Sequence, residues 1–337
     1  MLLQSDSQLD RRSLLKWAGW LAAAGTPFLP GCLSAHAASG GLTLWGIPAS
    51  PSAVFARAVA SGALDQIAPD MRFAVWKSTD QMRAGIVSGD FKLFATSTYA
   101  AANFFNRGAG TVMLNVVTWG VLYVMAHEEG ITKIEDLAGK RVLLSNKNEA
   151  PDLLFRLVLT WAGMDPDKDV ILDYVGSPGE AVPLYLAGRG DVALLHEPAS
   201  TAALFRASKA GVPLYRAIDI TEVYGNHTGR GPRIPQVGLA VNPAFLEEQP
   251  EIVAAVHQAC VDAGEWTRAN WGAAGKLAAQ SLPLPAPVIA QSLPYVHLDV
   301  QSAKEARADI DLYFEHLMSL DPGIIGGKMP SSGFYWG

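Results

Sequence analysis

Residues 71–99, with the sequence MRFAVWKSTDQMRAGIVSGDFKLFATSTY, decide the expected fold. Two β-type runs, at residues 71–78 and 91–99, enclose a stretch with helical spacing at residues 79–90. Residues 41–66 repeat the order, because a short apolar run precedes a second helical pattern. Strands that alternate with helices predict parallel strands joined by crossover helices. We therefore expect an open α/β sheet.

A second series of alternating elements follows the long apolar run at residues 111–129. This run can carry two consecutive strands that join near Trp119 and Gly120. Later strands are expected within residues 141–145, 170–176, 192–198 and 235–242, and helices within residues 150–165, 177–191 and 199–211. The remainder, to about residue 320, reads as mostly helical. The chain therefore contains two similar α/β units.

Composition excludes some classes of function. The 337 residues are 50% hydrophobic and 17% charged, which is enough to form the cores of about two domains. A net charge of −6 without a basic run argues against nucleic-acid binding. The two cysteines, Cys32 and Cys260, lie too far apart in sequence for paired metal-ligand spacing, so we expect no metal and no cofactor. We interpret Cys260 as a core thiol on a helix.

The start of the chain has the layout of an export signal. Arg11, Arg12 and Lys16 precede the apolar stretch 17–29, and small residues follow it. With about 13 residues, that stretch is shorter than the roughly 20 that a membrane-spanning helix needs. The run RRSLLK resembles a twin-arginine motif, which is typical of export in the folded state. We therefore predict a periplasmic protein.

Two processing sites fit this segment. The sequence LPGC at Cys32 resembles a lipoprotein box, so Cys32 is a candidate for lipidation. The sequence AHA at Ala37 fits an ordinary cleavage site. Residues 1–37 are thus predicted to be signal and linker, removed at Cys32 or after Ala37. Both alternatives remain open.

Aromatic and small polar side chains gather at the predicted strand ends. In open α/β sheets, ligands bind beyond the carboxyl ends of the strands and near helix N-termini. A flat ligand stacked on tryptophan and held by a few hydrogen bonds suits such a set. The ligand-binding candidates are Trp45, Gly46, Ser50, Trp76, Thr96, Ser97, Tyr99, Trp119, Asn146, Asn148, His196 and Glu197. The alternative is that each Trp fills a core edge and each Ser, Thr or Asn caps a helix.

Glu197 has two interpretations. It precedes Pro198 at a predicted helix start, where the dipole favours a carboxylate even without a ligand. As a binding residue it would accept a hydrogen bond from an N–H group of the ligand. Its neighbour His196 is a weaker candidate for the same site.

Enzyme motifs are missing from the sequence. There is no G-x-S-x-G elbow and no phosphate-binding G-x-x-x-x-G-K-[ST] loop. Residues 126–130, AHEEG, lack the second histidine of a metalloprotease motif. We therefore name no catalytic residue.

Several stretches, in the expected order, resemble the periplasmic substrate-binding proteins of ABC importers. The branch in question includes nitrate, sulfonate, taurine and thiamine-pyrimidine binders. The similarity extends over roughly residues 42–337 and rests on residues 78–108, 116–142, 150–175, 181–200, 235–253 and 326–336. Each stretch is a modest signal, but their order and spacing together make a strong one.

The resemblance implies the two-lobed type II periplasmic-binding-protein fold, in which each lobe is an open, mostly parallel sheet flanked by helices. Two crossover strands, near residues 116–124 and 236–242, would form the hinge. Lobe I would comprise residues 42–118 and 240–337, and lobe II residues 119–239.

The resemblance also implies binding without chemistry. A small organic solute would be enclosed between the lobes and delivered by a monomer to a membrane permease and its ATPase. The loop SNKNEAPD would face the cleft, with Asn146, Lys147 and Asn148 in place of the family's glycines. The match of the family's Glu-Pro pair makes Glu197 its acidic residue. Membrane contact would come from permease docking or a lipid anchor.

The ligand and two rival functions remain open. Trp45, Trp76, Trp119 and Glu197 favour an aromatic or heterocyclic ligand such as a pyrimidine. A sulfonate or nitrate would instead use cations, for which the candidates are Lys77, Lys147, Arg230 and Arg233. One rival is a ligand sensor outside transport. The other is a pyrimidine-synthase-like enzyme, a class that bears a cysteine-rich motif, whereas this chain has two cysteines.

Overall fold

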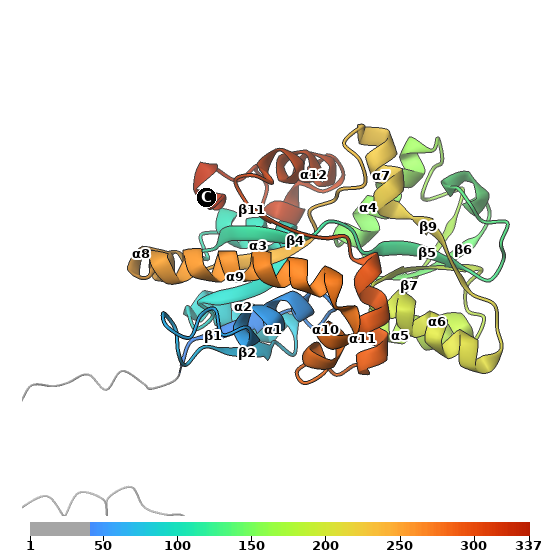
Figure 1. Ribbon diagram of the computed structural model, residues 1–337. Helices are drawn as coiled ribbons and strands as arrows, with labels where there is room; N and C mark the ends of the chain where they lie inside the picture. Colours follow the sequence, from blue (N-terminus) through green and yellow to red (C-terminus); the bar gives the residue numbers. More distant parts are fainter. Residues whose placement is uncertain (1–40) are drawn as a thin grey trace, which may run out of the picture. The chain divides into compact units, whose positions relative to one another are not determined.

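The computed structural model describes residues 41–337 (Figure 1). The predicted export signal in residues 1–37 and the candidate lipidation site Cys32 lie outside these residues. Between residues 41 and 337, no helix has both the length and the apolar character needed to span a membrane.

The first sheet has six strands in the order β11-β4-β10-β3-β1-β2. They are β1 (Thr43–Gly46), β2 (Arg72–Val75), β3 (Leu93–Ser97), β4 (Val112–Thr118), β10 (Val237–Val241) and β11 (Leu298–Ser302). Strand β1 pairs in parallel with β2 and β3, whereas β10 is antiparallel to β3 and β4, and β11 is antiparallel to β4. Strands β1 to β4 therefore all run in one direction.

The second sheet has five strands in the order β7-β6-β8-β5-β9. They are β5 (Leu122–Ala126), β6 (Arg141–Ser145), β7 (Ile171–Val175), β8 (Val192–His196) and β9 (Tyr215–Asp219). Strand β5 is antiparallel to both of its neighbours, and the pairs β6–β7 and β6–β8 are parallel. In each sheet one interior strand that is antiparallel to both of its neighbours, β10 or β5, is the first strand in sequence after the chain passes from the other sheet. The predicted α/β fold with two open sheets is confirmed, and both sheets combine parallel and antiparallel pairs.

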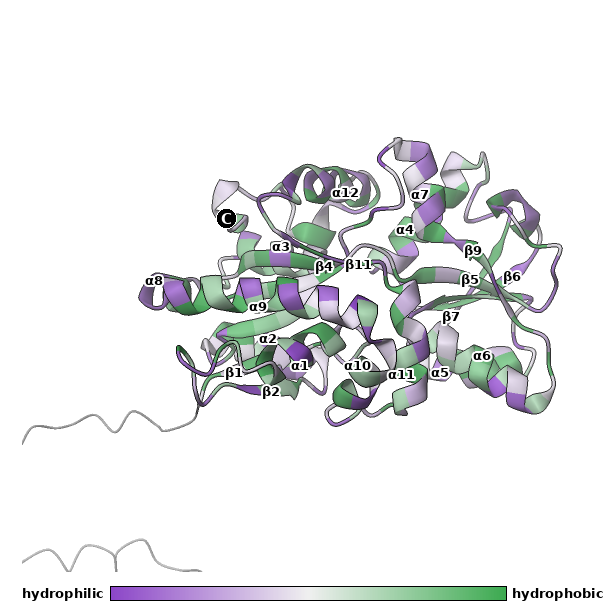
Figure 2. Ribbon diagram, in the orientation of Figure 1, coloured by the Kyte–Doolittle hydropathy of each residue, from purple (hydrophilic) through white to green (hydrophobic). Residues whose placement is uncertain are grey.

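Helices flank both sheets (Figure 1). They are α1 (Ser52–Ala60), α2 (Thr79–Ser88), α3 (Thr98–Asn106), α4 (Ala150–Trp161), α5 (Pro178–Leu186), α6 (Ala199–Ala210), α7 (Ile220–Thr228), α8 (Pro243–Glu248), α9 (Pro250–Ala269), α10 (Trp271–Ala278), α11 (Ala286–Ser292) and α12 (Arg307–Leu320). The central strands β4 and β5 are largely hydrophobic, whereas the helices carry polar residues along part of their surface (Figure 2). This distribution places the apolar cores between helices and sheets.

Local signals account for the fold of residues 71–99. The Ser78 hydroxyl accepts a hydrogen bond from the backbone N–H of Gln81 at 3.1 Å, which caps the start of α2. Gly89 ends the helix in the left-handed conformation, with φ of 77°. Strands β2 and β3 lie on either side, so the predicted order of strand, helix and strand is confirmed.

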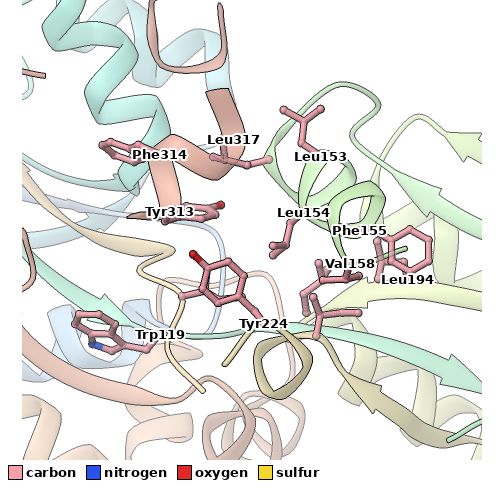
Figure 3. Close-up of a cluster of buried hydrophobic side chains, with 14 of the residues drawn as sticks. Trp119, Leu153, Leu154, Phe155, Val158, Leu194, Tyr224, Tyr313, Phe314 and Leu317 are labelled. Carbon is pink, nitrogen blue, oxygen red and sulfur yellow. The ribbon is translucent and has the colours of Figure 1, made fainter. Parts of the chain in front are cut away.

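One apolar cluster connects the two sheets. It contains Phe94 and Met113 from the first sheet and Val142 from the second, together with side chains from α3, α4, α7 and α12. Figure 3 shows Tyr313 and Leu317 of α12 on one side and Leu154 of α4 on the other. Because both sheets contribute to this cluster, it stabilises their junction as well as each sheet.

Two segments link the sheets. The first passage, residues 119–121, joins β4 to β5, and the second passage, residues 229–236, joins α7 to β10. The predicted join near Trp119 is confirmed. Strand β10 begins at Val237, so the second passage lies just before the predicted crossover at 236–242, and β10 spans the predicted lobe boundary at residue 240. The division into lobes stays a prediction.

Three elements were not predicted from sequence. Residues 212–234 were left unassigned but form β9 and α7. The C-terminal part is mostly helical, as expected, but it also contains the strand β11, which was not predicted. The β11 sequence, LDVQS, is short and polar, and it is a strand because it pairs with the edge of β4. Cys260 is free and buried on α9, as predicted.

We predict that Gly238→Ala destabilises the protein. A Cβ atom at this position in β10 would collide with the backbone carbonyl of Asn115 in β4. The free energy of unfolding, measured by urea denaturation, should fall by about 1–3 kcal/mol, the range for overpacking. Gly272→Ala in α10 is the control, since nothing lies within 4 Å of an added Cβ there. Equal stability of both variants would contradict the close strand packing.

Candidate ligand-binding site

The carboxyl ends of the strands of both sheets meet where the chain passes between the sheets. Strand β4 ends at Thr118, directly before the first passage. On the other side of that passage, Leu122 pairs with His196, the last residue of β8. Since β1, β2 and β3 run with β4, and β6 and β7 run with β8, both sets of carboxyl ends lie at this junction. Open α/β sheets bind ligands at this edge.

The two passages are hydrogen-bonded to each other. The N–H of Ile234 donates to the carbonyl of Trp119 at 2.7 Å, and the N–H of Gln236 donates to the carbonyl of Thr118 at 3.0 Å. The carbonyl of Gln236 in turn accepts a bond from the N–H of Thr98, the first residue of α3, at 3.0 Å. The start of α3 is therefore fixed to the connection between the sheets.

Two helices from opposite sheets begin close to each other. Helix α3 follows β3 and helix α4 follows β6, and neither N-cap residue, Ser97 or Glu149, caps its helix with its side chain. Burial raises the pKa of the Tyr99 phenol in α3, and the nearby Glu149 carboxylate raises it further. The Tyr99 phenol in the first turn of α3 therefore lies near the Glu149 carboxylate that precedes α4. Unpaired N–H groups and the helix dipole favour an anionic group at such places.

The loop before α4 is folded by its own polar groups. Asn146 and Asn148 both adopt a left-handed conformation with φ of 62°, which asparagine tolerates better than most residues. The Asn146 amide donates to the Glu149 carboxylate at 3.0 Å, and the N–H of Asn148 donates to the Asp152 carboxylate at 2.8 Å. The two asparagines thus fill positions that glycine could fill. Their predicted contact with a ligand is not tested by these bonds.

The three predicted tryptophans pack within the protein. Trp45 stacks on Phe91, with 4.3 Å between ring centroids. Trp76 is buried, and its indole N–H donates to the carbonyl of Ala95 at 3.0 Å. Trp119 is 1% exposed, and the guanidinium of Arg233 lies 3.6 Å from its ring centroid. These contacts favour a structural role, and stacking on a ligand stays a prediction.

The small residues at the ends of β1 and β3 differ in their surroundings. The Ser50 hydroxyl is fully buried and lies 2.5 Å from the hydroxyl of Ser292 in α11. A side chain at Gly46 would collide with the ring of Phe73, so glycine is required there for packing. Thr96 is buried and Ser97 partly buried at the end of β3. Of these residues, Ser97 is the most accessible at the junction.

Glu197, directly after β8, forms an ion pair with Arg216 of β9. Its Oε1 atom accepts bonds from the Arg216 guanidinium at 2.6 and 2.8 Å, and its Oε2 atom accepts one from the Thr201 hydroxyl at 2.8 Å. Burial raises the pKa of Glu197, while Arg216 and Thr201 lower it. Arg216 also lies 3.6 Å from the ring centroid of Tyr295. Both carboxylate oxygens are therefore occupied, and a ligand contact of Glu197 stays untested.

His196 lies beside this pair at the end of β8. Burial lowers the pKa of its imidazole, and its Nδ1 atom lies 3.1 Å from the Glu197 carbonyl. Across the part of the chain that the structure describes, no group of three or more His, Cys, Asp or Glu side chains could hold a metal ion.

Three buried polar residues at the junction were missed from sequence. Thr118 ends β4, Thr221 lies in the first turn of α7, and Gln236 ends the second passage. The sequence did contain a pattern that points to Thr118. Like the candidate Ser97, it is a hydroxyl residue at the end of an apolar strand. Thr221 lay in a stretch with no assigned element, so nothing placed it near the others.

The family follows from comparison with known proteins. Residues 65–279, more than half of the chain, match the model of the family described as ABC transporter, phosphonate, periplasmic substrate-binding protein. The chain belongs to this family and is the periplasmic substrate-binding component of an ABC transporter. A search of curated proteins found no match.

Solved structures with the same fold include several transport proteins. An ABC transporter structure from Parabacteroides distasonis is 20% identical, with a TM-score of 0.69 over 88% of this chain and 98% of that one. The aliphatic sulphonate-binding protein SsuA from Escherichia coli is 20% identical, with a TM-score of 0.63 and coverage of 82% and 93%. The nitrate-binding protein NrtA from Synechocystis is 13% identical, with a TM-score of 0.63 and coverage of 87% and 83%. At these identities the similarity shows the fold.

We predict that Glu197→Ala destabilises the protein, because Arg216 would remain largely buried without its partner. The free energy of unfolding in urea should fall by about 3 kcal/mol, as for other broken buried pairs. Arg216→Ala introduced into the Glu197→Ala variant should lower the free energy of unfolding less than it does in the wild type, because the two residues interact directly. Asp165→Ala, which breaks the exposed pair with Lys168, is the control and should change stability little. If Glu197→Ala unfolds with the same free energy as the wild type, the ion pair does not contribute to stability.

Proposed function

We propose that this protein binds a small solute with an oxyanion group, such as a phosphonate or a sulfonate, at the junction of its two sheets. It then delivers that solute to a membrane permease and its ATPase. The observation that carries the proposal is the approach of two helix N-termini, from α3 and α4, without side-chain caps. Such N-termini offer N–H donors and a partial positive charge to an anion.

The aromatic alternative has less support. Trp45, Trp76 and Trp119, which would stack on a ring, already contact other parts of the protein. Glu197, which would accept a bond from a ring N–H, is paired with Arg216. The family description names phosphonate, and the neighbours named above bind sulphonate and nitrate, all of which are oxyanions.

Arginine side chains near the junction are engaged with carboxylates. Arg216 pairs with Glu197, and Arg230 and Arg233 both pair with Asp309. An anion at the junction would therefore be held by backbone N–H and hydroxyl groups more than by guanidinium groups. Lys147, exposed in the loop before α4, lies three residues before the first residue of that helix, Ala150.

Binding would work without a chemical step. A solute that contacts both α3 and α4 would bind more tightly to a closed form, in which the starts of the two helices are together, than to an open form. Differential affinity of this kind shifts the population toward the closed form, which a permease can recognise. We expect the protein to act as a monomer.

We predict that the purified protein binds methylphosphonate or methanesulfonate and not a thiamine-type pyrimidine. A ligand at 100 times its Kd stabilises the folded state by about 2.7 kcal/mol, which a thermal-shift measurement detects. Isothermal titration calorimetry then gives the affinity, with nitrate and taurine in the same panel. Binding of the pyrimidine alone would contradict the oxyanion proposal and restore the heterocyclic alternative.

A further inference from the structure

Three buried polar atoms at the junction have no hydrogen-bond partner. They are the hydroxyl oxygens of Thr118 and Thr221 and the Oε1 atom of Gln236. Both threonines are fully buried, and Gln236 is 9% exposed. Within residues 41–337, six buried side-chain atoms lack a partner, and three of the six belong to residues of the junction. We call Thr118, Thr221 and Gln236 the junction polar residues.

These residues come from three segments that meet. The backbone N–H of Gln236 donates to the carbonyl of Thr118, which joins the second passage to the end of β4. A Cβ atom on Gly120, in the first passage, would collide with the hydroxyl of Thr221. The Thr221 side chain therefore lies against the first passage, two residues beyond Thr118. The carbonyl of Gln236 also binds the N–H of Thr98 at the start of α3.

Unpaired polar atoms of this kind destabilise a folded protein. A buried hydroxyl or amide without a partner loses its bonds to water and gains none in return. Valine has nearly the shape of threonine and would remove this cost. The junction polar residues instead keep their polar atoms, at the edge of the sheets where α/β folds bind ligands. We therefore expect these atoms to have a hydrogen-bond partner outside the chain.

We propose that the junction polar residues bind the oxyanion group of the solute and determine the specificity of the site. The inference rests on the proposed function, because it assumes that the junction is where the solute binds. Each threonine hydroxyl can donate a hydrogen bond to an oxyanion oxygen. The Gln236 amide can present its NH₂ group at the position of Oε1, because a flip exchanges the two ends.

The charged side chains around these residues already have hydrogen-bond partners. Asp219, next to the α7 start, accepts a bond from the N–H of Thr221 at 2.7 Å and lies 3.2 Å from Nε2 of His297. Arg233, in the second passage, is held by Asp299 and Gln301. The junction polar residues thus offer neutral donors in a buried place, where a hydrogen bond to an anion is stronger than in water.

The test compares three junction variants with two controls. The junction variants are Thr118→Val, Thr221→Val and Gln236→Leu. The controls, Thr111→Val and Thr267→Val, remove buried hydroxyls that also lack a partner but lie before β4 and within α9. For each variant, the midpoint of thermal unfolding is measured without ligand, and the affinity for methylphosphonate and methanesulfonate is measured by calorimetry.

The junction variants should unfold at the same or a higher temperature than the wild type and lose at least about tenfold in affinity, the effect of one hydrogen bond to a charged group. The controls should show the same stability trend with unchanged affinity. Wild-type affinity in all three junction variants would overturn the inference. A lower unfolding midpoint in all three would also overturn it, because the polar atoms would then serve a structural water.

The experiment distinguishes failure of the proposed oxyanion function from failure of the inference about the junction polar residues. If the wild type binds a pyrimidine instead of an oxyanion, the same variants are titrated with that pyrimidine. Loss of affinity there supports the junction polar residues as a binding site, and unchanged affinity overturns it. The unfolding midpoints need no ligand, so a destabilising effect counts against the inference whichever solute binds.

Discussion

The structure depends on the backbone hydrogen bonds between the two passages. The carbonyls of Thr118 and Trp119 accept bonds from Gln236 and Ile234, so the chain that leaves the first sheet and the chain that returns to it run together. Because each passage begins or ends beside the last residues of a strand, this pairing fixes the carboxyl ends of both sheets at one junction. The candidate site and the shared apolar cluster both follow from that constraint.

Most of the strongly charged and aromatic groups near the junction stabilise the protein itself. Arg233 lies on Trp119 and binds Asp299, while Arg216 lies on Tyr295 and pairs with Glu197. Tyr295 and Asp299 belong to the chain after β10, which returns to the first sheet. These contacts therefore connect that part of the chain with the second passage and with β9 of the second sheet. The groups that these contacts leave free for the proposed solute site are helix N–H groups and neutral side chains.

Sequence reasoning predicted the fold better than the site. Strands such as β4 and β5 were found because a continuous apolar run is typical of strands in a sheet that is covered on both faces. Strand β11 was missed because its polar sequence becomes a strand only through pairing with β4. At the site, the position of Glu197 at a strand end was right, but its partner Arg216 is 19 residues away in sequence.

The sequence by itself determined two alternating α/β units and the strand ends at which a ligand site was expected, because the periodicity of apolar residues acts over a few residues. Only the tertiary structure decided which polar groups are occupied and which are unpaired. Trp119, Glu197 and Thr118 all lie at strand ends. The side chains of Trp119 and Glu197 contact arginines from distant segments, whereas the Thr118 hydroxyl has no hydrogen-bond partner within residues 41–337. Such pairing depends on long-range contacts, which local sequence does not encode.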